Sequence, residues 1–252
     1  MTTIEKIAET KVPEVTLIFW IIKIFATTLG ETGGDAVSMS LNLGYLLSTG
    51  IFAVLFLAAV VYQIKSEKFH PVVYWLTIIA TTTVGTTLAD FADRSLGIGY
   101  AGGSSLLLVL LLGSLFVWQR SLGSISVSSI STPKAEMFYW VTIMFSQTLG
   151  TALGDWVADT EGLGFGVSAV LFGSLLAGIA IAYYRTTISR TVLFWAAFIL
   201  TRPLGAVVGD LLDKPMAQGG MELSRYSASA ALVLMIVICI FAFEHKAAKT
   251  AH

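Results

Sequence analysis

Long apolar segments separated by short polar stretches dominate the sequence. A helix of about 20 apolar residues crosses the hydrocarbon core of a bilayer. Segments of approximately that length lie at 15–37, 43–64, 72–92, 98–119, 137–157, 163–184, 191–212 and 223–243. They lack the two-residue alternation that is typical of a membrane β-barrel. The pattern therefore predicts an all-α integral membrane protein with eight transmembrane helices.

The composition agrees with a chain that is largely covered by lipid. Hydrophobic residues make up 56% and charged residues 12% of the chain, and the mean hydropathy is +0.81. A soluble domain carries about 25% charged residues. The formal net charge of −1 gives no reason to expect a nucleic-acid partner. The chain has a single cysteine, which excludes an intrachain disulfide framework. Its three histidines lie at or beyond the ends of apolar segments, which argues against a histidine-rich metal or haem site.

The distribution of basic residues predicts the orientation in the membrane. An even number of spans places both termini on one side. Ten basic residues fall on that side: Lys6, Lys11, Lys65, Lys68, Arg120, Lys134, Arg185, Arg190, Lys246 and Lys249. Three fall on the other side: Arg94, Lys214 and Arg225. Because basic residues accumulate in cytoplasmic loops, both termini are expected to be cytoplasmic.

A four-fold internal repeat underlies the apolar pattern. Each copy begins with an aromatic–Trp pair, whose tryptophans are Trp20, Trp75, Trp140 and Trp195. Ten residues later stands a glycine: Gly30, Gly85, Gly150 and Gly205. Fifteen residues after the Trp stands an aspartate: Asp35, Asp90, Asp155 and Asp210. Twenty-four residues after it stands a second glycine, which suits a turn: Gly44, Gly99, Gly164 and Gly219. Recurrence at fixed offsets indicates a repeat architecture.

Each repeat is expected to form a helical hairpin with two spans, so that all four insert in the same, parallel orientation. The predicted organisation is a cytoplasmic N-terminal segment (1–14), repeat 1 (15–70), repeat 2 (71–119), a Ser-rich cytoplasmic linker (120–136), repeat 3 (137–187), repeat 4 (188–244) and a cytoplasmic tail (245–252). The composition of the linker is typical of a flexible connection. The four repeated tryptophans are expected to be anchors at the membrane interface.

The segments FWIIKIFATTLGETGGD and FWAAFILTRPLGAVVGD show the aromatic–Trp, Leu-Gly and Asp positions together. On these residues the chain, from about 15 to 244, resembles a bacterial family of uncharacterised membrane-anchored proteins built from four tandem two-span repeats, each with a characteristic Trp. The resemblance implies an eight-span protein of the cell inner membrane. It implies no established activity, so the function has to be argued from the residues.

Small residues lie one helical turn apart just before each repeated aspartate. The pairs are Gly30 and Gly34, Gly85 and Ala89, Gly150 and Gly154, and Gly205 and Gly209. This spacing lets helix backbones approach closely in lipid. The first helices of the four repeats are therefore expected to pack around a common centre, with their aspartates converging near the non-cytoplasmic end.

Four further acids lie one turn from the repeated aspartates on the same helix face. They are Glu31, Asp93, Asp159 and Asp213. Charged groups inside spans are costly and usually mark an ion or proton pathway. Carboxylate oxygens suit hard cations such as Mg²⁺, Ca²⁺ or Mn²⁺. The eight acids are therefore expected to bind ions, with Asp35, Asp90, Asp155 and Asp210 as metal ligands and a divalent cation as substrate rather than cofactor.

Departures from the repeat place unusual polar residues on the first helices. Lys23, Glu31, Gln147 and Arg202 each stand where the other repeats have different residues. Because polar groups in lipid need partners, Lys23, Gln147 and Arg202 are expected to be counter-ions or gating residues. Pro203 frees a backbone carbonyl and predicts a kink. Lys23 and Arg202 are alternatively ligands of an anionic substrate, but eight acids against four nearby bases favour a cation.

Two functions stay open at this point. The first is a multipass transporter that exports or exchanges a divalent metal cation. The second is a non-transporting scaffold or sensor whose aspartates cap helices or bond turns, a role that suits Asp93, Asp159 and Asp213 equally well. An enzyme is not expected, since nucleophile-elbow, metalloprotease and phosphate-loop motifs are missing. The expected partners are the lipid bilayer and a small inorganic ion, with homo-oligomerisation left open.

Overall fold

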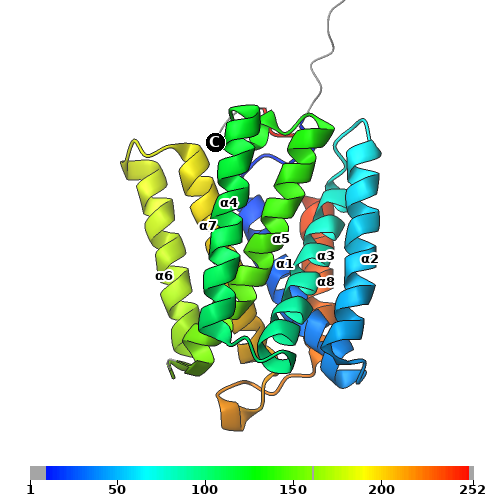
Figure 1. Ribbon diagram of the computed structural model, residues 1–252, viewed down its shortest axis with the longest axis vertical. Helices are drawn as coiled ribbons and strands as arrows, with labels where there is room; N and C mark the ends of the chain where they lie inside the picture. The colour runs from blue at the N-terminus through cyan, green and yellow to red at the C-terminus, as the bar shows by residue number, and fades with distance from the viewer. Residues whose placement is uncertain (1–9, 161, 250–252) are drawn as a thin grey trace, which may run out of the picture.

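The computed structural model describes residues 10–160 and 162–249, in which the chain forms eight long helices and no strand. The helices are α1 (Leu17–Asp35), α2 (Gly44–Lys65), α3 (Pro71–Asp90), α4 (Tyr100–Leu122), α5 (Pro133–Asp155), α6 (Gly164–Arg185), α7 (Arg190–Asp213) and α8 (Arg225–Ala242). They run along one common direction (Figure 1). The expected all-α class is confirmed. The parts of the expected terminal segments at 1–9 and 250–252 lie outside the described residues.

Six of these helices are long and apolar enough to cross a membrane, and the exceptions within the described chain are α1 and α5. Both carry three charged residues: Lys23, Glu31 and Asp35 in α1, and Lys134, Glu136 and Asp155 in α5. Both pack against several other helices, which shield polar side chains from lipid. The six apolar helices and the composition characterise a membrane-embedded protein.

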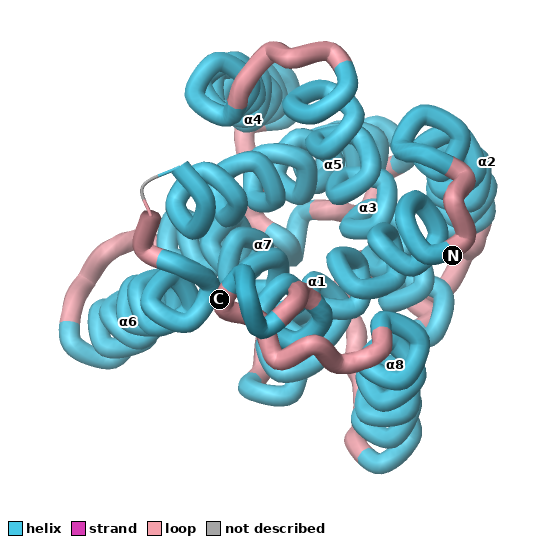
Figure 2. Tube along the Cα trace, turned by 90° about the horizontal axis from the view of Figure 1, so that it is seen from below, coloured by secondary structure: helices cyan, strands magenta, loops and turns pink. Residues whose placement is uncertain are grey.

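The first helices of the four repeats form a closed ring. Each packs on two neighbours in the order α1, α3, α5, α7 and back to α1. Figure 2 shows this ring surrounded by α2, α4, α6 and α8. The outer helices do not pack mainly on their own repeat: α2 lies on α3, α4 on α5, α6 on α7 and α8 on α1. The two helices of a repeat are thus joined by a turn but make their main contacts elsewhere, because each inner helix uses its flanks for the ring and its outer face for the preceding repeat.

Glycines allow the inner helices to approach closely. At each interface of the ring, the glycine ten residues after a Trp lies against the residue seven after the next Trp; we call this contact the glycine seam. The four pairs are Gly30–Thr82, Gly85–Gln147, Gly150–Arg202 and Gly205–Thr27. A Cβ atom at Gly85 would lie 2.9 Å from the backbone carbonyl carbon of Gln147, closer than packed atoms approach.

A second contact lies one turn further along three of these interfaces. The pairs are Gly34–Thr86, Gly154–Ala206 and Gly209–Glu31. At Gly209, an added Cβ atom would lie 2.6 Å from the Glu31 Cβ. All seven glycines of the predicted helix faces therefore contact the neighbouring inner helix.

The turns after the repeated aspartates have a common build in the first three repeats. There α1, α3 and α5 continue as π-helical turns at Ala36–Ser40, Phe91–Ser95 and Trp156–Thr160. The glycines twenty-four residues after each Trp all adopt positive φ, from 71° at Gly164 to 85° at Gly219. A side chain with a Cβ atom is strained there, which explains the glycine at this offset.

Aromatic residues fill the opposite end of the ring. Trp75, Trp140 and Trp195 are only 0%, 2% and 4% exposed, and Trp20 is half-buried. The hydroxyl groups of Tyr74 and Tyr139 form a hydrogen bond of 2.6 Å. The three buried tryptophans thus differ from the interfacial anchors expected from the sequence. Their rings fill the space between the inner helices at the end away from the glycine seams.

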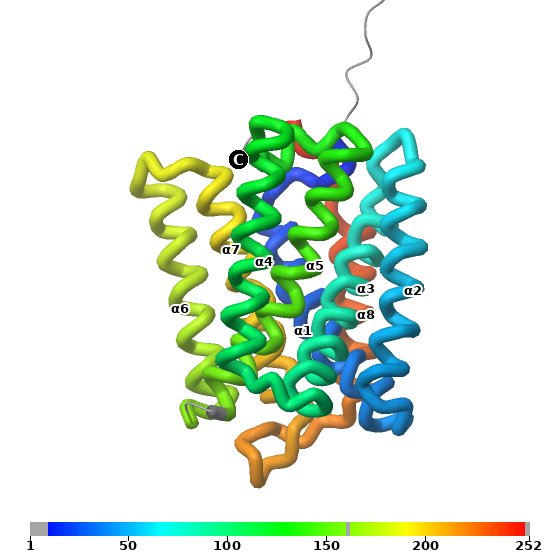
Figure 3. Tube along the Cα trace, in the orientation of Figure 1, coloured from blue at the N-terminus to red at the C-terminus, as the bar shows by residue number. Residues whose placement is uncertain are grey.

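The two described ends of the chain meet over this aromatic end (Figure 3). Pro13 and Ala247 form an antiparallel bridge, and Lys11 forms a 2.7 Å ion pair with Glu136. The linker at 120–136 is packed rather than flexible, because Val127 and Ile130 are buried and the Thr10 hydroxyl donates to the Val127 carbonyl. The Ser-rich composition of the linker gave no indication that Val127 and Ile130 are buried.

We predict that Gly85→Ala lowers the unfolding temperature of the purified protein in detergent. Its methyl group meets the backbone of Gln147, and overpacking costs about 1–3 kcal/mol. Gly173→Ala is the matched control, because nothing lies within 4 Å of a Cβ added there on α6. The control should unfold at or slightly above the wild-type temperature. Equal unfolding temperatures for the two variants would contradict the seam.

Candidate functional site

Six acidic side chains gather at the end of the ring opposite the aromatic residues. They are Glu31, Asp35, Asp90, Asp155, Asp210 and Asp213. Each is at most 7% exposed. Asp35, Asp90 and Asp155 are the last α-helical residues before the π-helical turns, whereas Asp210 lies one turn before the end of α7. The four repeated aspartates therefore meet in the interior, as the helix faces predicted.

The six carboxylates form three overlapping groups that match the size of a cation site. The groups are Glu31–Asp35–Asp90, Glu31–Asp155–Asp210 and Asp35–Asp210–Asp213. In each, one oxygen per residue lies within 4.8 Å of the others. Oxygens on opposite sides of a Ca²⁺ ion lie about 5 Å apart, since its bonds are about 2.3–2.6 Å long. The donor set is hard and anionic, and it fits a divalent cation.

The inner helices reach this site through stacked layers of side chains, because residues four apart share a helix face. One layer contains Thr27, Thr82, Gln147 and Arg202. The next contains Glu31, Thr86, Thr151 and Ala206, and the last contains the four repeated aspartates. Every member of the three layers is at most 3% exposed. A polar column thus leads from the middle of the ring to the carboxylates.

Arg202 joins all four inner helices in the centre of this column. Its Nη2 atom lies 2.9 Å from Glu31 Oε2 and 2.5 Å from the hydroxyl oxygens of both Thr86 and Thr151. Its Nη1 atom donates to the Thr27 carbonyl at 3.3 Å. Glu31 and Arg202, which both depart from the repeat pattern, are therefore one buried ion pair.

Two basic residues bridge the repeated aspartates in pairs. Arg94 lies 2.9 Å from Asp90 and 3.5 Å from Asp155. Lys214 lies 2.6 Å from Asp35 and 3.0 Å from Asp210. Both bases stand nineteen residues after a Trp, where the other two repeats have Met39 and Asp159. The two bases link the four repeated aspartates as two pairs, so the charges of the ring have two-fold rather than four-fold symmetry. The presence of a base at this offset in only two repeats is visible in the sequence.

Acids still outnumber bases in the cluster. Arg225, whose role the sequence did not reveal, lies 2.7 Å from Asp213. With Arg94, Arg202 and Lys214 it makes four bases against six carboxylates, an excess of two negative charges when all are ionised. Within the described chain, the Oδ1 atoms of Asp155 and Asp213 are buried without a hydrogen-bond partner. Buried carboxylate oxygens need such partners, and a cation supplies one.

Four residues expected at the site lie outside these groups. Lys23 is fully buried, but its ammonium nitrogen lies 4.1 Å from the centre of the Phe198 ring and, among the described residues, pairs with no carboxylate. The Gln147 amide also has no partner there. Asp159 is exposed and Asp93 is half-buried. Of the three expected counter-ion or gating residues, Arg202 is therefore the one that pairs with an acid within residues 10–160 and 162–249.

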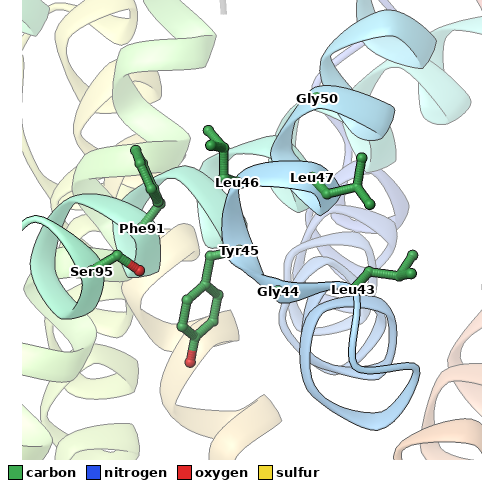
Figure 4. A pocket seen from close by; sticks show the side chains of 8 residues that line it. All are labelled: Leu43, Gly44, Tyr45, Leu46, Leu47, Gly50, Phe91 and Ser95. Carbon is green, nitrogen blue, oxygen red and sulfur yellow. The ribbon is translucent and has the colours of Figure 1, made fainter.

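A surface pocket of about 540 Å³ lies at the same end of the bundle but is separate from the carboxylates. It is lined by Leu43, Gly44, Tyr45, Leu46, Leu47, Gly50, Phe91 and Ser95. Figure 4 shows the Tyr45 hydroxyl pointing away from Leu46 and Leu47. None of the six clustered acids lines this largely apolar pocket, so it does not define the ion site.

The fold and the cluster define a membrane-embedded protein of four interlocked helical repeats with an acidic centre. A family model described as a Repeat of Unknown Function (DUF347) matches residues 18–69, 73–123, 138–189 and 193–247. The chain belongs to this repeat family, which confirms the resemblance seen in the sequence. No curated protein and no solved structure matches the chain.

We predict that Arg202→Gln destabilises the protein by about 3–5 kcal/mol, because it leaves the Glu31 carboxylate buried without its positive partner. Adding Glu31→Gln should recover part of this loss. Denaturant unfolding of the wild type, both single variants and the double variant measures the coupling. Strictly additive effects of the two substitutions would show that the ion pair is not the source of the loss.

Proposed function

We propose that the protein is an eight-span transporter that exports or exchanges a divalent metal cation through the carboxylate cluster. The observation that carries this proposal is the excess of two buried carboxyl groups over the paired bases, together with the Oδ1 atoms of Asp155 and Asp213, which lack hydrogen-bond partners among the described residues. In a permanent structural network the large majority of buried polar atoms have hydrogen-bond partners. A binding site for a cation of charge +2 instead keeps oxygens available.

In this proposal, Glu31, Asp155 and Asp210 are the central ligands, and Asp35 and Asp90 complete the cluster on either side. Arg94 and Lys214 are built-in counter-ions that hold the aspartates in the ion-free protein. Arg94 suits this role because its side chain is 34% exposed and has room to turn outward. Cation binding then replaces one of the bridging bases, which changes the excess from two negative charges to one when all carboxylates are ionised.

The proposed topology has eight spans and cytoplasmic termini in the cell inner membrane. The inner helices α1 and α5 cross the bilayer although their composition is less apolar, since other helices cover them. The three bases assigned to the outer side, Arg94, Lys214 and Arg225, all pair with acids of the cluster. The positive charge that no clustered acid balances therefore lies on the side of the chain termini, as expected for the cytoplasmic side. The aromatic end then closes the column toward the cytoplasm, and transport requires the ring to open there.

A non-transporting scaffold is the second candidate, and a specific observation favours it. Arg94 and Lys214 each tie two repeated aspartates together at 2.6–3.5 Å. Such bridges would also serve to lock four repeats into one ring. The two candidates differ in whether a cation binds between the bridged pairs.

We predict that Asp155→Asn weakens Mn²⁺ binding to the purified full-length protein at least tenfold, or about 1.4 kcal/mol. The substitution removes one anionic ligand from the centre of the cluster. Isothermal titration measures the affinity, and Mn²⁺ flux into proteoliposomes should fall in parallel. Asp159→Asn is the matched control on the same segment, and its exposed carboxyl group predicts unchanged binding and flux.

Equal Mn²⁺ affinities of wild type, Asp155→Asn and Asp159→Asn would defeat the assigned site. Wild-type protein that binds Mn²⁺ at this site but passes none across the vesicle membrane would favour the scaffold. Circular dichroism and size-exclusion profiles of each variant check that the fold is retained.

A further inference from the structure

A groove on the lateral face of the bundle marks a place where the two halves of the protein differ. It has a volume of about 440 Å³ and lies between α1 and α6 over the beginning of α7. The first half of the protein contains repeats 1 and 2, and the second half contains repeats 3 and 4. When the halves are matched, α6 corresponds to α2 and α1 corresponds to α5. The outer helix α2 contacts α5, whereas α6 makes no comparable contact with α1. The groove therefore lies where a helix–helix contact is missing.

Smaller side chains on α6 account for the missing contact. Phe56 and Val60 of α2 pack into the main hydrophobic core. The residues at the same offsets in repeat 3 are Leu176 and Ala180, and both line the groove. The loss of side-chain volume leaves a cleft that opens sideways toward the surrounding lipid and reaches inward to Thr201.

The chemistry of the groove changes along its length. Its walls are apolar, with Trp20 and Ile24 from α1, Leu176 and Ala180 from α6, and Ala197 from α7. Apolar walls of this kind hold an acyl chain by close van der Waals packing.

The end of the groove near the chain termini is polar and basic. Thr16, Tyr183, Tyr184 and Arg190 line it there. The Arg190 guanidinium lies 4.2 Å from the centre of the Tyr183 ring and donates to the Tyr183 carbonyl. Among the described residues, no carboxylate lies within ion-pair distance of it. A cation held by an aromatic ring beside an apolar cleft is complementary to an anionic headgroup.

We propose that this groove binds one anionic phospholipid, with an acyl chain along α6 and the headgroup phosphate at Arg190. Lipid is the partner that a lateral apolar cleft meets in a membrane, and Arg190 selects for negative charge. The bound chain fills the missing contact between α6 and α1 and lies against Thr201, the residue before Arg202. This site is independent of the proposed transport of a cation.

Native mass spectrometry of the purified full-length protein tests this proposal. The protein is delipidated in detergent and then incubated with phosphatidylglycerol or phosphatidylcholine. The wild type should retain one phosphatidylglycerol, with about fivefold preference over phosphatidylcholine, as expected for one basic residue at an anionic headgroup. Arg190→Gln should abolish this preference.

Two further variants separate the groove from general lipid adhesion. Ala180→Phe fills the apolar part and should prevent retention of both lipids. Arg120→Gln is the matched control, because Arg120 is an exposed basic residue at the end of α4, and it should leave both retention and preference unchanged. Retention unaffected by Arg190→Gln and Ala180→Phe would overturn the proposal. So would a lipid-free dimer that Ala180→Phe converts to monomer, because a second copy would then occupy the groove.

Discussion

The close approach of the inner helices at the glycine seams is the constraint on which the rest of the structure depends. At each seam a glycine lies directly against a side chain or backbone of the next inner helix. In lipid, helices gain little from burying apolar surface against each other, so association rests on close packing and on polar contacts. The four seams close the ring, and a closed ring forces the side chains that follow each glycine toward one axis. The aspartate five residues after each seam glycine is therefore interior rather than lipid-facing.

The acidic interior in turn explains where the repeats stop being alike. Four buried aspartates alone would repel one another strongly, and two repeats supply a base nineteen residues after the Trp to bridge them in pairs. One further acid, Glu31, enters with its own partner Arg202, which hydrogen-bonds to threonines of the two other inner helices. The symmetric glycines build the ring, and the asymmetric residues set the charge of its centre. The proposed cation site uses both groups, with the repeated aspartates as ligands and the asymmetric bases as counter-ions.

The sequence was sufficient for the helices, the repeat and the convergence of the acids, because these follow from spacing along one chain. Glycine faces and aspartates recur at fixed offsets, and a helical period places them on one side. The sequence was insufficient for the packing order, since periodicity assigns a face to Gly85 but does not say that Gln147 lies against it. For the same reason the sequence did not reveal that three tryptophans are buried, since their amphipathic rings suit an interface and an interior equally. It also did not reveal the surroundings of Lys23, whose partner is the ring of Phe198 on another helix. Arg225 is a base at the start of an outer helix, and only the interlocked arrangement brings it to Asp213.

The most direct measurement of the central claim is an anomalous difference map from a crystal of the wild-type protein grown with Mn²⁺. The account predicts one dominant peak inside the ring, about 2.1–2.6 Å from carboxylate oxygens of Glu31, Asp155 and Asp210, with Arg94 or Lys214 turned away from its aspartates. A map with no peak among these residues, and with both bases still bridging the aspartate pairs, would contradict it.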